Sequence, residues 1–83
     1  MSVVSKTIKY LLDKNISVST AESCTGGLLA AEFTAMSGIS KIYKTGLITY
    51  SNDSKIKNLK VKPSTIKRYG AVSRQVCAQM CLH

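Results

Sequence analysis

Apolar residues near the start of the chain recur at helical spacing, with lysines on the other faces. The pattern predicts an amphipathic helix over residues 2–14, ended by Asn15. Its apolar face consists of Val4, Ile8, Leu11 and Leu12. Residues 16–21 then alternate apolar and hydroxyl side chains in a β-branched run, which predicts a strand.

A second helix and a second strand are predicted after the first strand, so helices and strands alternate along the chain. The helix is predicted over residues 28–36, ending before Ser37-Gly38, and the strand over residues 46–50. The buried stripe of this helix is predicted to be Leu29, Phe33 and Met36.

Three short helices are predicted after the second strand. The first covers residues 54–59 behind a capping cluster at 51–53, and the second runs from Pro63 to a stop at Gly70. The third begins after Ser73 as its cap. Its apolar stripe is Val76, Cys77, Met80 and Cys81.

This order of elements is an α/β pattern, which usually places helices on both faces of a parallel or mixed sheet. Only two strands are predicted, and so small a sheet has little stability of its own. Every predicted helix is amphipathic but lacks a further layer to pack against. The predicted fold is therefore a partial three-layer α/β/α domain, with helices packed on a truncated sheet.

Positive charge is confined to the second half of the chain. The net charge is +8, and cations and carboxylates balance in residues 1–40, so residues 41–83 carry all of it. A basic half indicates an anionic partner, either a nucleic acid or a phosphorylated small molecule. The alternative is a solvated lysine surface, because only Lys67-Arg68-Tyr69 resembles a stacking platform for bases.

Three cysteines do not make a disulfide framework, because the number is odd and no Cys-x-x-Cys pair occurs. Cys77 and Cys81 have helical spacing and could supply two metal ligands, with His83 as a third. We expect no metal site, and instead expect all three cysteines, Cys24 included, to be reduced residues of the apolar core.

The apolar runs are too short to span a membrane, and the N-terminus lacks the features of a signal peptide. The sequence therefore predicts a cytoplasmic protein that has no membrane contact.

The segment from Thr20 to Gly27 stands between a predicted strand and a predicted helix. Ligands bind at such junctions of α/β proteins, because free N–H groups at the helix start attract anions and glycine admits a ligand closely. A ligand site is one interpretation of this segment. The other is a tight turn that needs glycine for its backbone conformation.

Polar residues also flank the second strand, as Ser37-Gly38-Ile39-Ser40 before it and as the run from Thr49 to Lys55 after it. A serine and a lysine form a hydrolytic pair when burial or neighbouring cations lower the pKa of a lysine from about 10.4 toward 7. In a chain so rich in both residue types, the pair alone does not separate a catalytic site from a solvated surface.

Four segments, taken in order, resemble the C-terminal domain of the competence/damage-inducible protein CinA and its stand-alone form, the nicotinamide-nucleotide amidases. They are residues 21–31, Gly38-Ile39-Ser40, the run from Tyr50 to Lys55, and Gly70-Ala71-Val72-Ser73. The resemblance extends over essentially the whole chain.

The resemblance implies an amidohydrolase that converts nicotinamide mononucleotide to nicotinic acid mononucleotide and ammonia, a step of pyridine-nucleotide salvage. It implies Ser40 as the nucleophile, Lys55 as its general base and Tyr50 as a residue that lines or orders the site. A small-molecule nucleotide is the implied substrate, and no metal or organic cofactor is implied.

The same resemblance implies a set of substrate-binding residues: Glu22, Ser23, Thr25, Gly26, Gly27 and Asn52. Backbone N–H groups at residues 25–27 would bind either the phosphate or the developing oxyanion. The sequence leaves both alternatives open.

The family domain is longer than this chain, so residues 1–83 are expected to be a truncated CinA C-terminal-like domain, equivalent to its N-terminal half. We expect such a fragment to be inactive alone. One alternative is half of an enzyme completed by a separate second half or by a homo-oligomer, with Leu29, Phe33, Val76 and Met80 at the interface. Another is a basic nucleic-acid-binding module over residues 41–74, which lacks a known reader motif.

Overall fold

The computed structural model describes residues 2–82. Within them the elements follow the order α1 (Val3–Asp13), β1 (Val18–Glu22), α2 (Leu28–Thr34), the 3₁₀-helix η1 (Ile39–Lys41), β2 (Tyr43–Ile48), α3 (Asn52–Leu59), α4 (Pro63–Tyr69) and α5 (Arg74–Leu82). The chain forms two compact units, one ending at Leu47 and the other beginning at Ile48.

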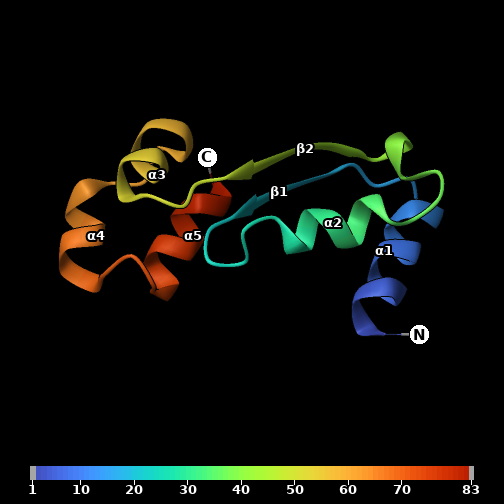
Figure 1. The fold of residues 1–83 in the computed structure, drawn as a ribbon, viewed down its shortest axis with the longest axis horizontal. Helices are drawn as coiled ribbons and strands as arrows, with labels where there is room; N and C mark the ends of the chain where they lie inside the picture. Colours follow the sequence, from blue (N-terminus) through green and yellow to red (C-terminus); the bar gives the residue numbers. More distant parts are fainter. Residues whose placement is uncertain (1, 83) are drawn as a thin grey trace. The chain divides into compact units, whose positions relative to one another are not determined.

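The first unit is built on a sheet in which β1 and β2 lie side by side and run in the same direction (Figure 1). The pairing begins where the Val18 N–H donates to the Ile42 carbonyl over 2.8 Å. Helix α2 connects the carboxyl end of β1 to the amino end of β2, as a parallel pair requires. The predicted α/β fold class is confirmed.

The core of the first unit lies where α1, α2 and η1 meet β2. Its buried side chains are Ile8, Phe33, Ile39 and Ile42, of which Ile42 has no exposed surface. The ring of Phe33 packs at a tilt on Tyr43, with 5.5 Å between ring centroids. Half-buried Leu11, Leu12, Val18 and Met36 surround this core, so α1 and α2 bury most of the apolar faces predicted for them.

Both strands are shifted from their predicted positions. β1 starts later because the Ile16 N–H still bonds to the Leu11 carbonyl, in a turn formed by left-handed Asn15 at φ 55°. β2 starts earlier, at Tyr43, whose hydroxyl lies 2.7 Å from the Thr20 hydroxyl on β1. This contact between strands is not encoded in the local pattern, where polar Lys44 and Thr45 interrupt the apolar run.

The second unit consists of α3, α4 and α5, whose predicted caps are confirmed. The Ser51 side chain accepts from the Ser54 N–H, Pro63 opens α4, and the Ser73 side chain accepts from the Val76 N–H. Gly70 ends α4. Only the start of α3 differs from its prediction, because Asn52 and Asp53 form its first turn instead of preceding it.

The second unit has its own small core, made by α3 and α5 and the link after α3. Leu59, Val61 and Val76 are its buried apolar residues. Gln79 of α5 fixes the start of α4, because its side chain accepts from the Lys62 N–H and donates to the Thr65 hydroxyl. No described helix has the length and apolar character needed to cross a membrane.

The prediction of three core cysteines is wrong. Cys24, Cys77 and Cys81 are free and exposed. On α5 the buried position is Val76, and Met80 is half-buried. Since positions 77 and 81 project from other sides of the helix than position 76, the face that packs on α3 is narrower than the predicted stripe.

Candidate functional site

The glycine-rich turn after β1 is organised by the carboxylate of Glu22. Oε1 accepts from the Thr25 hydroxyl and the Leu29 N–H, both at 2.8 Å, and Oε2 accepts from the Ala30 N–H at 3.0 Å. Glu22 is only 4% exposed. Its side chain therefore caps the first turn of α2. The sequence did not reveal this role, because Glu22 precedes the glycine-rich turn and the N-cap position is Gly27.

Gly26 and Gly27 make this arrangement possible. Both have positive φ, 60° and 103°, a backbone region that side chains disfavour. The turn folds back so that the Gly26 N–H donates to the Ser23 carbonyl over 3.0 Å. Glycine is therefore needed here for its backbone conformation, which is one of the two interpretations that the sequence left open. The Leu29 and Ala30 N–H groups, at the start of α2, already bind the Glu22 carboxylate.

The Glu22 carboxyl is shifted toward its ionised form. Burial by itself raises the pKa of Glu22, but hydrogen bonds from the Ala30 N–H, the Thr25 hydroxyl and further backbone N–H groups outweigh it. The pKa therefore lies below the ordinary value of 4.5. Because the pKa of Glu22 is lower in the folded chain than in the unfolded chain, the ionised carboxylate stabilises the fold at pH values above 4.5. This stabilisation is lost as the pH falls through the folded pKa.

Glu22→Gln is therefore expected to lower the thermal unfolding midpoint near neutral pH by roughly 5 °C, since a neutral amide cannot accept all these hydrogen bonds or match the helix dipole. Circular dichroism melts from pH 7 down to pH 3 provide the measurement. The difference in unfolding midpoint between the variant and the wild-type chain should shrink at pH values below 4.5, the ordinary pKa of a glutamate carboxyl. Glu32→Gln, a change at an exposed position of α2, is the matched control. A constant difference at every pH would contradict the capping role.

Ser40 lies in η1, which follows Gly38 in a left-handed conformation at φ 78°. Its side chain is exposed, whereas its neighbour Ile39 is buried in the core. Within the first unit, Ser40 lies at the amino end of the sheet and the turn from Ser23 to Gly27 lies at the carboxyl end (Figure 1). The fold of this unit therefore does not bring Ser40 together with the residues of the turn.

Lys55 is the most unusual of the predicted site residues. It belongs to α3 but is only 2% exposed, and its Nζ donates to the Tyr50 carbonyl at 3.2 Å. No carboxylate among the described residues pairs with it, since the one ion pair found there joins Lys57 to Asp53. The sequence did not distinguish Lys55 from its neighbouring lysines, because the burial of a side chain depends on tertiary packing.

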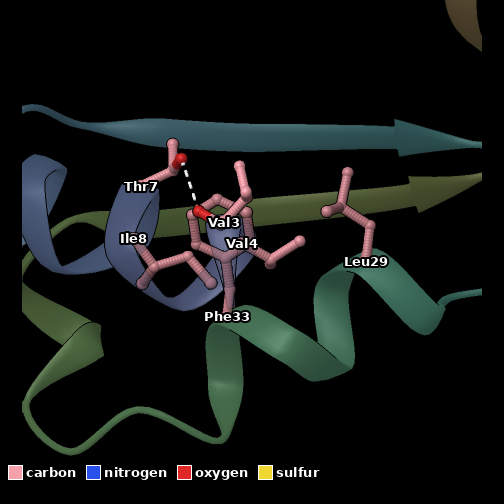
Figure 2. Close-up of a pocket in the computed structure, with 6 residues that line it drawn as sticks. All are labelled: Val3, Val4, Thr7, Ile8, Leu29 and Phe33. Carbon is pink, nitrogen blue, oxygen red and sulfur yellow. Dashed lines mark hydrogen bonds between the residues drawn. The ribbon is translucent and has the colours of Figure 1, made fainter. Parts of the chain in front are cut away.

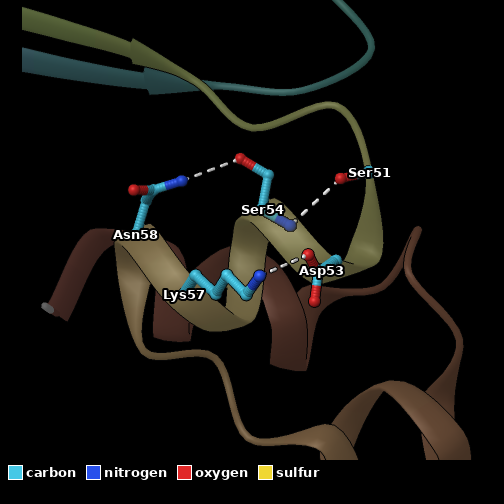
Figure 3. Close-up of polar contacts among 5 residues, drawn as sticks. All are labelled: Ser51, Asp53, Ser54, Lys57 and Asn58. Carbon is cyan, nitrogen blue, oxygen red and sulfur yellow. Dashed lines mark hydrogen bonds and ion pairs between the residues drawn. The ribbon is translucent and has the colours of Figure 1, made fainter.

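The outer face of α3 carries polar contacts of a different kind (Figure 3). Lys57 and Asp53 pair at 3.1 Å with side chains more than 70% exposed, and the Asn58 amide donates to the Ser54 hydroxyl. Exposed pairs of this type contribute little to stability. Lys55 and Lys57 thus have opposite environments, because positions two apart project from opposite sides of a helix.

Tyr50 and Asn52 remain on the surface. Tyr50 is 73% exposed, and it contacts Lys55 through its backbone carbonyl instead of its phenol. Asn52 is exposed at the first position of α3. Among the predicted site residues, hydrogen bonds join Lys55 to Tyr50 in the second unit, and Glu22 to Thr25 and Gly26 to Ser23 in the first.

Thr49 is a polar residue that the sequence analysis did not single out. It is 1% exposed, and its Oγ1 has no hydrogen-bond partner among the described residues. A buried hydroxyl left unpaired costs about 1–3 kcal/mol. Its one signal in the sequence is its position directly before Tyr50, where the run that resembles the CinA family begins.

Residues 2–82 contain no group of three or more His, Cys, Asp or Glu side chains that could hold a metal ion. His83, the third ligand considered for a site with Cys77 and Cys81, lies outside the described residues.

The family model of the CinA C-terminal domain matches residues 1–83. The chain belongs to the CinA C-terminal domain family. Among relatives of this CinA-family chain, a putative competence-damage inducible protein from Clostridium novyi is 56% identical over 72 residues, which is 87% of this chain and 17% of the relative. A protein of the same description from Acetivibrio thermocellus is 51% identical over the same share of each chain.

Solved structures of CinA proteins share the fold. A CinA superfamily protein from Escherichia coli aligns with a TM-score of 0.86 and 38% identity, covering 93% of this chain and 45% of that one. The competence/damage inducible protein CihA from Agrobacterium tumefaciens aligns with a TM-score of 0.85 and 39% identity, covering 96% and 53%. The chain thus spans about half of these structures and under a fifth of the curated relatives' length.

Proposed function

We propose that this CinA-family chain contributes the reacting residues of a nicotinamide mononucleotide amidohydrolase. In this proposal Ser40 is the nucleophile, Lys55 is its general base and Tyr50 orders the site. The observation that carries the proposal is the burial of Lys55, whose amine is shielded from water and has a backbone carbonyl as its hydrogen-bond partner. This is the kind of environment in which a lysine serves as a base.

The proposed reaction proceeds through an acyl-enzyme. As the base of the proposed reaction, the Lys55 amine takes the proton of the Ser40 hydroxyl while Oγ attacks the carboxamide carbon. The tetrahedral intermediate collapses as the lysine ammonium gives its proton to the amide nitrogen, so that the C–N bond breaks and the nitrogen leaves as ammonia. A water molecule, deprotonated by the same amine, then attacks the ester, which releases nicotinic acid mononucleotide and restores Ser40. No step requires a metal or an organic cofactor.

The substrate-binding role of Glu22, Ser23, Thr25, Gly26, Gly27 and Asn52 is part of the proposal. Glu22 contributes to this role indirectly, because its carboxylate already occupies the start of α2 and shapes the turn that would hold the substrate. A phosphate at the Leu29 and Ala30 N–H groups would have to displace that carboxylate. The buried hydroxyl of Thr49 is an additional group that a bound substrate could satisfy.

Ser23 is a competing candidate for the nucleophile, and the order of the strands supports it. It follows the carboxyl end of β1, and the run with Tyr50 and Lys55 follows the carboxyl end of β2, whereas Ser40 precedes β2. Ligands in parallel α/β sheets bind at the carboxyl ends of the strands. With Ser40 as the nucleophile, the working enzyme has to bring its hydroxyl to the Lys55 amine from the amino end of β2, within one chain or between two copies of it.

Ser40→Ala and Ser23→Ala separate the two assignments. The assay is ammonia release from nicotinamide mononucleotide by this chain fused to the portion of the E. coli protein that it does not match. We expect Ser40→Ala to lower kcat at least about hundredfold with little change in KM, and Ser23→Ala to act chiefly on KM. The reverse pattern would assign the nucleophile to Ser23. Absence of ammonia release from the unsubstituted fusion would contradict the amidase proposal.

A further inference from the structure

An apolar pocket of about 280 Å³ lies between α1 and α2 in the first unit (Figure 2). We call this cavity the α1–α2 pocket. Its lining residues are Val3, Val4, Thr7, Ile8, Leu29 and Phe33. Ile8 and Phe33 form its floor, since both belong to the buried core. The outer residues are exposed: Val3 by 80%, Val4 by 39% and Leu29 by 40%.

The chemistry of the pocket does not suit a nucleotide. Its one polar side chain is Thr7, whose hydroxyl donates to the Val3 carbonyl at 2.8 Å and is thereby satisfied within α1 (Figure 2). Small-molecule sites combine apolar walls with a few polar groups that orient the ligand, and typically measure about 300–1,000 Å³. A pocket without an available polar group instead suits apolar side chains of a protein.

The length of the related structures indicates which protein segment covers the pocket. The first unit repeats the fold of CinA proteins, but the chain spans only 45% of the E. coli structure and 53% of the Agrobacterium one. The remaining half of such a domain must bury its own apolar faces against this one. Helices α1 and α2 of the first unit present the required complement, a two-helix groove into which the ridge of another helix can pack.

We propose that the α1–α2 pocket is the docking surface for the remaining portion of the CinA domain, whether that portion continues the same chain or is a separate polypeptide. Apolar side chains of that portion fill the pocket and cover Val4 and Leu29. Of the interface residues predicted from sequence, Leu29 is thus retained. Phe33 contributes the floor of the pocket, whereas Val76 is already buried and lies outside it. This docking is independent of the chemistry proposed for Ser40 and Lys55.

Binding between two purified polypeptides tests this surface. One is this chain, and the other is the portion of the E. coli CinA superfamily protein that it does not match. We expect them to form a one-to-one complex in size-exclusion chromatography with light scattering. Val4→Lys and Leu29→Lys should each weaken the association by at least about tenfold in calorimetry, since each places a charge in the apolar contact.

Ile16→Lys is the matched control, because Ile16 is 43% exposed in the same unit but lies outside the pocket. It should bind as tightly as the unsubstituted chain. Val4→Ala and Leu29→Ala keep the helices intact, and circular dichroism verifies that each variant is folded. Equal affinity of all variants would overturn the proposal. It would also be overturned if the two polypeptides did not associate, or if the chain self-associated through the pocket.

Discussion

Lys55→Met is expected to reduce the release of ammonia from nicotinamide mononucleotide by at least about 10³-fold while leaving the chain folded. Methionine retains most of the apolar stem that packs in the second unit, where Lys55 is 2% exposed, but it has no amine to take a proton. The loss should appear in kcat with little change in KM, because the base acts in the transition state. The assay is steady-state ammonia release by the fusion with the remaining portion of the CinA domain.

The same substitution should maintain or raise the unfolding midpoint. The Lys55 Nζ has one hydrogen-bond partner among the described residues and no ion pair there, so an apolar side chain would remove an incompletely satisfied buried group. A buried residue that lowers stability in its native form but is needed for activity is not retained for packing alone. Opposite changes in activity and stability would therefore distinguish a catalytic role from a structural one.

Lys57→Met is the matched control for this experiment. Lys57 lies on the same helix but is exposed and paired with Asp53, so its replacement should change both activity and stability little. Equal activity of Lys55→Met and the unsubstituted fusion would contradict the role of Lys55 as the base. It would leave the family assignment intact, since that rests on the match over residues 1–83.

Ile42→Ala is expected to destabilise the first unit by about 2–5 kcal/mol, through lost burial and the cavity that remains. Ile42 has no exposed surface and contributes to the core formed with Ile8, Phe33 and Ile39. Its carbonyl also accepts the first hydrogen bond between the strands, from the Val18 N–H. Marginal domains have net stabilities of only about 5–15 kcal/mol, so this change removes much or all of the stability.

Urea titration followed by circular dichroism measures this loss. Ile16→Ala provides the matched control, because it deletes the same atoms from a side chain that is 43% exposed. We expect it to cost well under half as much as Ile42→Ala, as a surface substitution usually does. Similar losses for the two variants would show that the core around Ile42 does not determine the stability of the unit.

Local chemistry made most element types and several boundaries predictable. The caps at Ser51 and Ser73, the helix start at Pro63 and the stops at Asn15 and Gly70 all depend on neighbouring residues only, and each agrees with the structure. The resemblance in the segments around Glu22, Ser40 and Lys55 likewise led to the CinA family, which the match over residues 1–83 establishes.

The strand positions could not be read from the sequence, because they depend on partners distant along the chain. β2 begins at Tyr43, whose ring packs on Phe33 and whose hydroxyl meets Thr20. The placement of the cysteines failed for a related reason. Side chains at apolar positions of a helix are buried only where another element covers them, and α5 has such cover at Val76 but not at Cys77 or Cys81.

By itself, then, the sequence determined the α/β class, the order of the elements, the helix caps and the family, since periodicity, capping and motif strings are local properties. Only the tertiary structure decided what the polar residues do. It turned Glu22 into the cap of α2, buried Lys55 while exposing Lys57, left the Thr49 hydroxyl without a hydrogen-bond partner within residues 2–82, and placed Ser40 at the opposite end of the sheet from the glycine-rich turn. These outcomes depend on burial and on contacts between segments far apart in the chain, which no local pattern records.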